Sequence, residues 1–266
     1  MIDVIINADK GCLPENAVEL NGAKRFMLNV LTAMGDEASS LPLGDFLRQY
    51  HSLSGKWLVL TPIYWQATHN DAMIIAAGQD LQFSEDEARE WYAALADFLQ
   101  VENIRLYYHD KYTWLINIDG LPDISSKPAE LILHQSMMPA LAAMDKSLHW
   151  QKRLTELQMF LSNHSLNNKR TDRCPVNGVW AFGGGVFEWP QGRVILSDDH
   201  DLQAHFSSYI QPWLPEQVLP DNALVIISNA GAGQLNLRQN NGVRWYWNDI
   251  AYQTSKKKWW KRFLRG

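Results

Sequence analysis

The chain alternates short apolar runs with longer segments of helical period, and this alternation narrows the folds open to it. Runs rich in β-branched residues predict strands at 3–9, 55–65, 71–77, 193–199, 222–228 and 243–249. Pro62 is expected to break or bulge its strand, because proline has no N–H to donate. Residues 104–118 predict a hairpin that turns at 109–112.

Helical spacing is clearest at 84–99. Ser84 and Glu87 form a capping-box pattern there, and apolar side chains recur on one face. The same spacing predicts helices at 19–34 and 145–163. Because helices alternate with apolar strands, the predicted fold class is α/β, a mixed sheet with flanking helices and some antiparallel hairpins.

Charge divides the chain into an acidic body and a basic tail. With 266 residues, 46% of them hydrophobic, the chain is long enough to bury a sizeable core. We expect a single α/β unit over 1–266, with 57–170 as a candidate subdomain. The formal net charge is −5, and removing the six cations of 256–266 leaves −11. The body is therefore not expected to bind nucleic acid non-specifically.

Residues 256–266 form a basic aromatic tail. Its charged and aromatic side chains include Lys256, Lys257, Lys258, Trp259, Trp260, Lys261 and Arg262. Such a set suits an anionic membrane surface or single-stranded nucleic acid. Because the tail is short and has no longer amphipathic pattern, the sequence favours docking of its aromatic side chains on the acidic body over either of these. Contact with membrane or nucleic acid is expected only through this tail.

Cysteine usage and the N-terminus indicate a cytoplasmic protein. Cys12 and Cys174 are too few for a disulfide framework and favour a reducing compartment. No basic region precedes an apolar run at the N-terminus, so no signal peptide is expected. No apolar run approaches the roughly 18 residues that a membrane span needs.

The stretch CPVNGVWAFGGGVFEWP, residues 174–190, holds three consecutive glycines, Gly183, Gly184 and Gly185. A P-loop needs Gly-Lys-Ser/Thr after its glycines, but Val186 and Phe187 follow here. A dinucleotide fingerprint needs a further glycine where Glu188 stands. The run therefore predicts a loop in which the backbone closely approaches a ligand or another backbone.

Polar side chains surround this run in the sequence. His164, Asn167 and Arg170 follow the predicted helix at 145–163, and Asn177 and Trp180 lead into the glycines. An arginine with histidine and amide groups can receive a phosphate or a carboxylate. His164 and Arg170 also suit the negative end of that helix, so both interpretations stay open.

A second cluster raises a metal hypothesis. Asp198, Asp199, His200 and His205 are candidate ligands for a divalent ion such as Mn or Zn. His200 and His205 are five residues apart, which takes them off a common helical face, and acidic residues also suit the first turn of a helix. The main expectation is therefore that the protein has no cofactor.

Residues 149–185, HWQKRLTELQMFLSNHSLNNKRTDRCPVNGVWAFGGG, resemble the signature block of bacterial RpfE-type regulatory proteins, which are described as cofactor-independent phosphoglycerate mutase-like. Further matches are LTPIYWQATHNDAMII at 60–75, YTWLI at 112–116 and VRWYWNDI at 243–250. The resemblance covers most of the chain from Trp57 onward. It implies an alkaline-phosphatase-like α/β fold, of which this chain is a candidate remnant.

Enzymes of that class use an Asp-Gly entry motif, a Ser or Thr nucleophile and Asp/His ligands for two metals. Here the first strand ends in NADKGCLPEN, and the late strand ends in Asn229 and Ala230 where such enzymes present Asp-His. We therefore expect a non-catalytic regulatory or partner-binding protein without the metal centre, whose partner is a protein or a small phosphorylated ligand. The alternatives are a metal-dependent phosphoryl-transfer enzyme and a protein that binds membrane or single-stranded nucleic acid through its tail.

Overall fold

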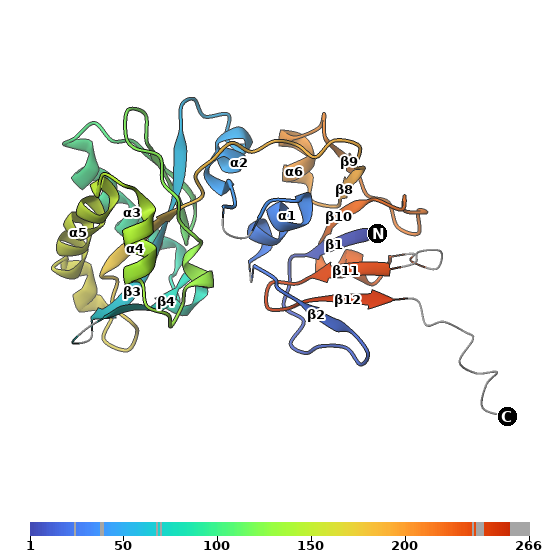
Figure 1. The fold of residues 1–266 in the computed structure, drawn as a ribbon, viewed down its shortest axis with the longest axis horizontal. Helices are drawn as coiled ribbons and strands as arrows, with labels where there is room; N and C mark the ends of the chain where they lie inside the picture. The colour runs from blue at the N-terminus through green and yellow to red at the C-terminus, as the bar shows by residue number, and fades with distance from the viewer. Residues whose placement is uncertain are drawn as a thin grey trace. The chain divides into compact units, whose positions relative to one another are not determined.

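The computed structural model describes residues 1–23, 25–37, 40–67, 69, 71–235, 237 and 242–255. The chain forms two compact units: unit 1 comprises Met1–Asp36 and Glu188–Gly266, and unit 2 comprises Glu37–Phe187 (Figure 1). The expected subdomain at 57–170 falls inside unit 2. Whether the chain folds as one cooperative unit stays a prediction. The predicted α/β class, with a mixed sheet and antiparallel hairpins, is confirmed.

Unit 1 is built on a seven-stranded mixed sheet with the order β2-β12-β11-β1-β10-β8-β9. Its strands are β1 (Ile2–Ile6), β2 (Val18–Leu20), β8 (Ile195–Ser197), β9 (Ile210–Pro212), β10 (Leu224–Ile227), β11 (Gly242–Tyr246) and β12 (Ala251–Ser255). The strands from β11 to β9 are parallel, and β11-β12-β2 is antiparallel. Every residue of β1 is buried, as expected for the centre of a parallel sheet covered on both faces.

The helices of unit 1 are α1 (Phe26–Met34), α6 (His200–His205) and α7 (Asn229–Ala232). The prediction of one helix over 19–34 is wrong in its first part, because Val18–Leu20 pairs with β12 as an edge strand. Helix α1 begins only at Phe26 and ends at Met34, and the left-handed φ of 114° at the next residue suits a C-cap glycine, Gly35. Cross-strand pairing thus overrides local helical spacing.

Unit 2 contains an antiparallel five-stranded sheet centred on β3 (Trp57–Ala67). Strand β3 pairs with β4 (Ala72–Ala77), β6 (Thr113–Asn117) and β7 (Gly178–Phe182), and β6 also pairs with β5 (Leu106–Asp110). The expected break at Pro62 is wrong, since β3 runs through it and the irregularity lies between Tyr64 and Trp65. Pro62 falls between the residues paired with β6 (57–60) and those paired with β4 (63–67), and it stands opposite Val179 in the ladder with β7, so the strand continues through it.

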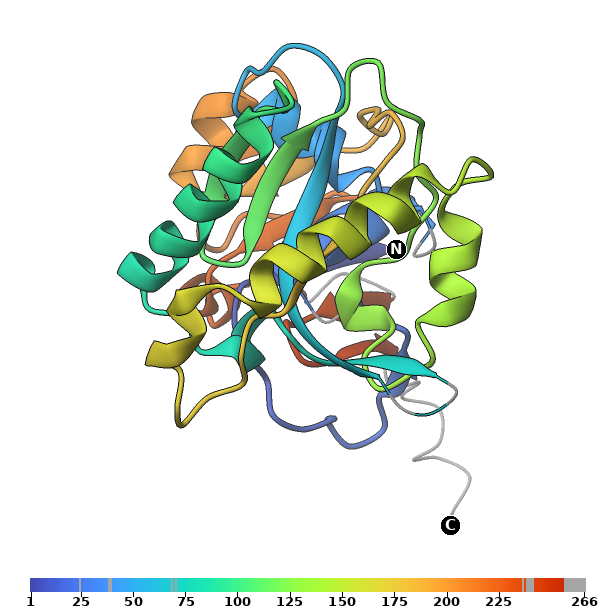
Figure 2. The same ribbon diagram turned by 90° about the vertical axis from the view of Figure 1, so that its left-hand side faces the viewer.

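The helices of unit 2 are α2 (Leu43–Tyr50), α3 (Glu85–Gln100), α4 (Met138–Met144) and α5 (His149–Ser162), with short 3-10 helices η1 (Gly78–Leu81), η2 (Ala129–Leu131) and η3 (Ser165–Lys169). The predicted cap of α3 is confirmed, because Ser84 Oγ accepts from the Glu87 N–H. Figure 2 shows α3 and α5 in front of the strands, so both cover the same face of the sheet. Helix α4 is not anticipated by the sequence pattern.

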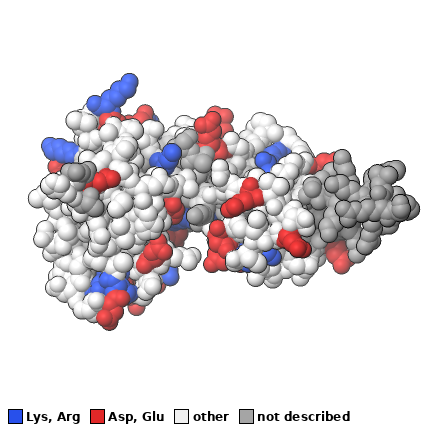
Figure 3. All heavy atoms as spheres, turned by 60° about the horizontal axis from the view of Figure 1, so that its bottom comes forward, with Lys and Arg blue, Asp and Glu red and all other residues white. Residues whose placement is uncertain are grey.

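Among the described residues, no helix is both long enough and apolar enough to cross a membrane. On the face shown in Figure 3, acidic and basic side chains lie interspersed over a largely uncharged surface. The described residues on that face form no large basic patch. The expectation that the body does not bind nucleic acid non-specifically stays a prediction.

Candidate functional site

The glycine run follows β7 directly, and its first two members allow close backbone contact. Gly183 has a φ of +84°, and its carbonyl accepts from the Gly44 N–H at 2.9 Å. A Cβ on Gly184 would lie 2.8 Å from the carbonyl oxygen of Ile124. Because side chains at these positions would strike backbone atoms, Gly183 and Gly184 are required by packing between chain segments.

Gly185 has a different environment. Its φ is +105°, and the nearest atom to an added Cβ is 3.7 Å away on Pro42. Gly185 lines a cavity of about 390 Å³, which we call the glycine pocket. Its lining residues are Ser40, Asp45, Gly55, Lys56, Trp57, Leu58, Ile118, Asp123, Ile124, Ser125, Ser126, Gly184, Gly185 and Val186. All of them belong to unit 2.

Strand register brings one wall of the glycine pocket together. Trp57 at the start of β3 pairs with Asn117 at the end of β6, so the residues just outside both strands become neighbours. The Lys56 N–H donates to Asp119 Oδ1 at 2.8 Å, and Asn117 Nδ2 donates to Asp119 Oδ2 at 3.0 Å. These hydrogen bonds, with that from the Lys56 N–H foremost, lower the pKa of Asp119 from its ordinary value.

The charged groups of the glycine pocket differ in how firmly they are held. Asp45 accepts from Arg48 Nε at 2.6 Å and from the Phe187 N–H at 2.9 Å, so it ties α2 to the chain after the glycines. Lys56 Nζ lies 3.1 Å from Asp123 Oδ1, and these side chains are 66% and 80% exposed. The second ion pair therefore lies at the pocket rim, where solvent makes it weak.

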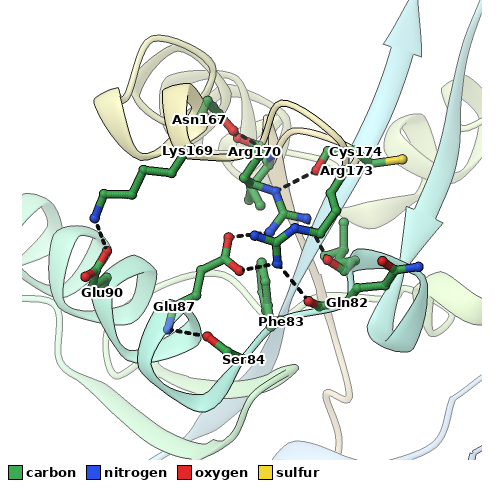
Figure 4. A network of polar contacts seen from close by, with 12 residues as sticks. Gln82, Phe83, Ser84, Glu87, Glu90, Asn167, Lys169, Arg170, Arg173 and Cys174 are labelled. Carbon is green, nitrogen blue, oxygen red and sulfur yellow. Dashed lines mark hydrogen bonds and ion pairs between the residues drawn. The ribbon is translucent and has the colours of Figure 1, made fainter.

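The polar residues predicted to meet the glycines form a separate network around η3. Arg170 is buried and donates to Glu87, to the Leu81 carbonyl at 2.6 Å and to the Cys174 carbonyl at 2.7 Å. Its guanidinium also lies over the Phe83 ring, 5.0 Å from the centroid. Figure 4 shows Glu87 between two arginines, with Arg173 donating to it at 2.8 Å. Arg170 therefore joins η3 to the start of α3.

His164 and Asn167 also make internal contacts. The His164 ring accepts from the Leu166 N–H at 3.3 Å, and its centroid lies 5.3 Å from that of Trp91. Asn167 donates to the carbonyls of Leu161 and Val176, each at 3.0 Å, and accepts from the Val176 N–H at 2.8 Å. Both side chains thus fix the turn between α5 and β7.

A smaller cavity of about 200 Å³ adjoins this network. It is lined by Ser84, Asp86, Glu87, Glu90, Leu166, Lys169 and Arg173. Lys169 donates to Glu90 at 2.8 Å and Arg173 to Glu87, so carboxylates already occupy the positions facing its cations (Figure 4). The cavity therefore offers little to an incoming anion.

Asn177 and Trp180 lie on β7 or just before it. Asn177 extends the pairing with β3, since its side chain accepts from the Trp65 N–H at 2.9 Å and donates to the Trp65 carbonyl at 2.8 Å. Trp180 is fully buried, and its indole donates to the Lys127 carbonyl at 2.8 Å. Neither residue is among those lining the glycine pocket.

The residues of the metal hypothesis follow β8. Asp198 accepts from Ser228 Oγ at 2.6 Å and from the Ser228 N–H at 2.8 Å. Asp199 caps α6, and the His205 ring lies 2.8 Å from the Asp201 carbonyl oxygen. His200 is exposed in the first turn of α6. Over the described part of the chain, no group of three or more His, Cys, Asp or Glu side chains is arranged to hold a metal ion. The metal-ligand set stays a prediction.

The tail residues Lys256 to Arg262 lie outside the described residues, so their role stays a prediction. The sequence pattern did not single out Lys56 and Asp123, which lie 67 positions apart. The one local signal is the Gly55-Lys56 pair at the start of the predicted strand at 55–65. The β3–β6 register is what makes these residues neighbours.

Comparison with known proteins gives only a distant structural likeness. No family model matches the chain, and no curated protein matches it. Among solved structures, the cofactor-independent phosphoglycerate mutase from Thermoplasma acidophilum DSM 1728 aligns over 96% of this chain and 90% of that chain, with 12% identity and a TM-score of 0.36. At this similarity no residue role passes from that protein to this one.

Proposed function

We propose that this chain is a non-catalytic regulatory protein of the cytoplasm, of the RpfE type, and that it acts by binding a small ligand in the glycine pocket of unit 2. One observation carries the proposal: the glycine run ends in the wall of a cavity of about 390 Å³, a volume within the range of small-ligand sites. Gly185 leaves the pocket open where a side chain would narrow it.

The lining provides the two kinds of contact that ligand sites combine. Trp57, Leu58 and Ile118 supply an apolar wall. Lys56 supplies a cation, and Ser125 and Ser126 supply hydroxyls. Within the described residues, the N–H groups of Gly184, Gly185 and Val186 donate to no other group. Such donors favour a ligand with an anionic group, a phosphate or a carboxylate.

The other polar residues singled out in the sequence make hydrogen bonds within the protein and do not line the glycine pocket. Arg170, Asn167 and Asn177 each direct their side-chain donors to carbonyls or carboxylates of the protein itself. Groups held in this way fix the framework around β7, and Gly184 and Gly185 of the pocket wall follow β7 closely in the chain. The proposed role for these residues is therefore to shape the pocket.

Thermal-shift and calorimetric titrations with 3-phosphoglycerate, inorganic phosphate and small carboxylic acids test the proposal. Val186→Trp should fill the pocket and abolish the response, because Val186 is one of the lining residues. The variant should still fold, because the Val186 side chain is 76% exposed. Val101→Trp is the matched control, an 85% exposed valine at the end of α3. Turnover of 3-phosphoglycerate with manganese, or unchanged binding in Val186→Trp, would overturn the proposal.

A further inference from the structure

We infer that the glycine pocket takes a free α-amino acid with a large apolar side chain. This inference rests on the function proposed above and narrows its ligand. The observation behind it is the pair of opposite charges at the rim, with Lys56 Nζ 3.1 Å from Asp123 Oδ1. A zwitterion presents a carboxylate and an ammonium close together, so one ligand can satisfy both residues.

The backbone of Lys56 is held while its side chain is exposed. Its N–H donates to Asp119, and its carbonyl accepts from the Ile118 N–H at 2.9 Å and from Asn117 Nδ2 at 3.2 Å. The side chain remains 66% exposed. The main chain of Lys56 is therefore fixed at the mouth of the pocket, while the ammonium is exposed to an incoming carboxylate.

The segment bearing Asp123 is held from both sides. Trp150 Nε1 donates to the Pro122 carbonyl at 2.9 Å, and the Ser125 N–H donates to the Met144 carbonyl at 2.9 Å. The carboxylate of Asp123 is itself 80% exposed. The two rim charges thus face each other from two anchored segments, one before β3 and one after β6.

The rim pair opens at little cost. Exposed ion pairs contribute about 0–1 kcal/mol, because solvent screens them and both side chains lose entropy. An amino acid can pair its carboxylate with Lys56 and its ammonium with Asp123. Both rim charges then stay paired after the ion pair between them opens. An incoming phosphate would pair with Lys56 but would leave Asp123 beside a doubly charged group.

The remaining lining fits this ligand class. Asp45 is neutralised by Arg48 and committed to the Phe187 N–H, so it adds no free charge. The apolar wall, Trp57 and Leu58 above all, suits a large hydrocarbon or aromatic side chain. At about 390 Å³ the pocket lies toward the small end of ligand sites, which fits a single amino acid better than an extended ligand.

Calorimetric titration of the full chain tests the inference with four probes: L-phenylalanine, N-acetyl-L-phenylalanine, which lacks the ammonium, L-phenylalaninamide, which lacks the carboxylate, and 3-phosphoglycerate. L-Phenylalanine should bind at least about tenfold more tightly than either capped derivative. Lys56→Gln and Asp123→Asn should each weaken it by about tenfold or more. Lys169→Gln removes a comparably exposed ion pair outside the pocket and should change binding less than about twofold.

Asp123→Asn and Lys56→Gln should also differ in which of the phenylalanine probes they no longer distinguish. Asp123→Asn should bind L-phenylalanine and its N-acetyl derivative alike, whereas Lys56→Gln should bind L-phenylalanine and its amide alike. Equal binding of all three phenylalanine probes by the native chain would overturn the inference. Binding of 3-phosphoglycerate alone, lost in Val186→Trp, would overturn it and leave the proposed function standing. No binding by any probe would overturn both.

Discussion

Replacing Gly44 with alanine tests the packing around α2, because helix propensity and steric packing predict opposite effects on the stability of the variant. Gly44 lies in the first turn of α2, and in a helix a change from glycine to alanine stabilises by about 0.5–1 kcal/mol through backbone entropy. In this fold, however, an added Cβ would lie 2.2 Å from the Trp57 carbonyl oxygen and 2.9 Å from Leu58 Cα. It would also lie 2.9 Å from the Gly183 carbonyl oxygen.

The magnitude follows from those contacts. Ordinary Cβ contacts begin at 3.4 Å, so backbone on two sides must move, and overpacking of this kind costs about 1–3 kcal/mol. Displacement also weakens the hydrogen bond from the Gly44 N–H to Gly183, worth about 1 kcal/mol. After the gain in helix propensity is subtracted, the variant should lose about 1–3 kcal/mol.

Urea unfolding followed by circular dichroism measures this change. Gly233→Ala is the control, since Gly233 follows α7 with a φ of −70° and its added Cβ meets nothing closer than 3.7 Å. The control should stay within about 0.5 kcal/mol of the native chain. If Gly44→Ala is as stable as the native chain or more so, the close packing of α2, β3 and the glycine run is refuted.

Three further changes follow from the same contacts. Arg170→Met leaves Glu87 without its buried cation and should lower the free energy of unfolding by about 3–5 kcal/mol. Arg173 is more exposed, so Arg173→Gln should lower it by about 1 kcal/mol or less. Similar losses for the two variants in urea unfolding would contradict the assignment of the buried pair. Asn177→Ala should cost about 1–3 kcal/mol in the same assay by leaving strand groups unpaired, and a neutral result would remove its role in extending β7. The pKa of Asp119 is lowered in the fold, so its contribution to stability is present above its ordinary pKa near 4 and is lost as pH falls through the lower folded value. Asp119→Asn should therefore reduce the loss of stability at acid pH in a plot of unfolding free energy against pH. An unchanged loss at acid pH would disprove the contribution.

The elements that the sequence predicts well are those whose signals are local. The helix at α3 has a cap and a regular apolar face within one segment, and the β5–β6 hairpin has its turn between adjacent strands. The helix expected at 19–34 is wrong only in its first part, because residues 18–20 pair with β12, more than 200 positions away, whereas α1 is present at Phe26–Met34. Local spacing carries no information about such a partner.

In the candidate site, too, the sequence predicts what has a local signal and misses what depends on strand pairing. The sequence predicts that the backbone of the glycine run closely approaches either a ligand or another backbone. At Gly183 and Gly184 the structure shows close contact with other backbone. The ligands proposed beside it, Arg170 among them, are near it in sequence but bond to the start of α3. Lys56 and Asp123 have ordinary surroundings in the sequence, and only the register of β3 with β6 places them together.

The most direct test of the ligand pocket is to observe its backbone while a ligand is added. In a nitrogen-15 correlation spectrum of the full chain, L-phenylalanine should shift the amide signals of Gly184, Gly185 and Val186 far more than those of Gly192 and Gly233 in unit 1. Val186→Trp should remove the shifts at the two glycines. If L-phenylalanine binds but these three amides do not respond, the ligand does not occupy the glycine pocket and the account is wrong.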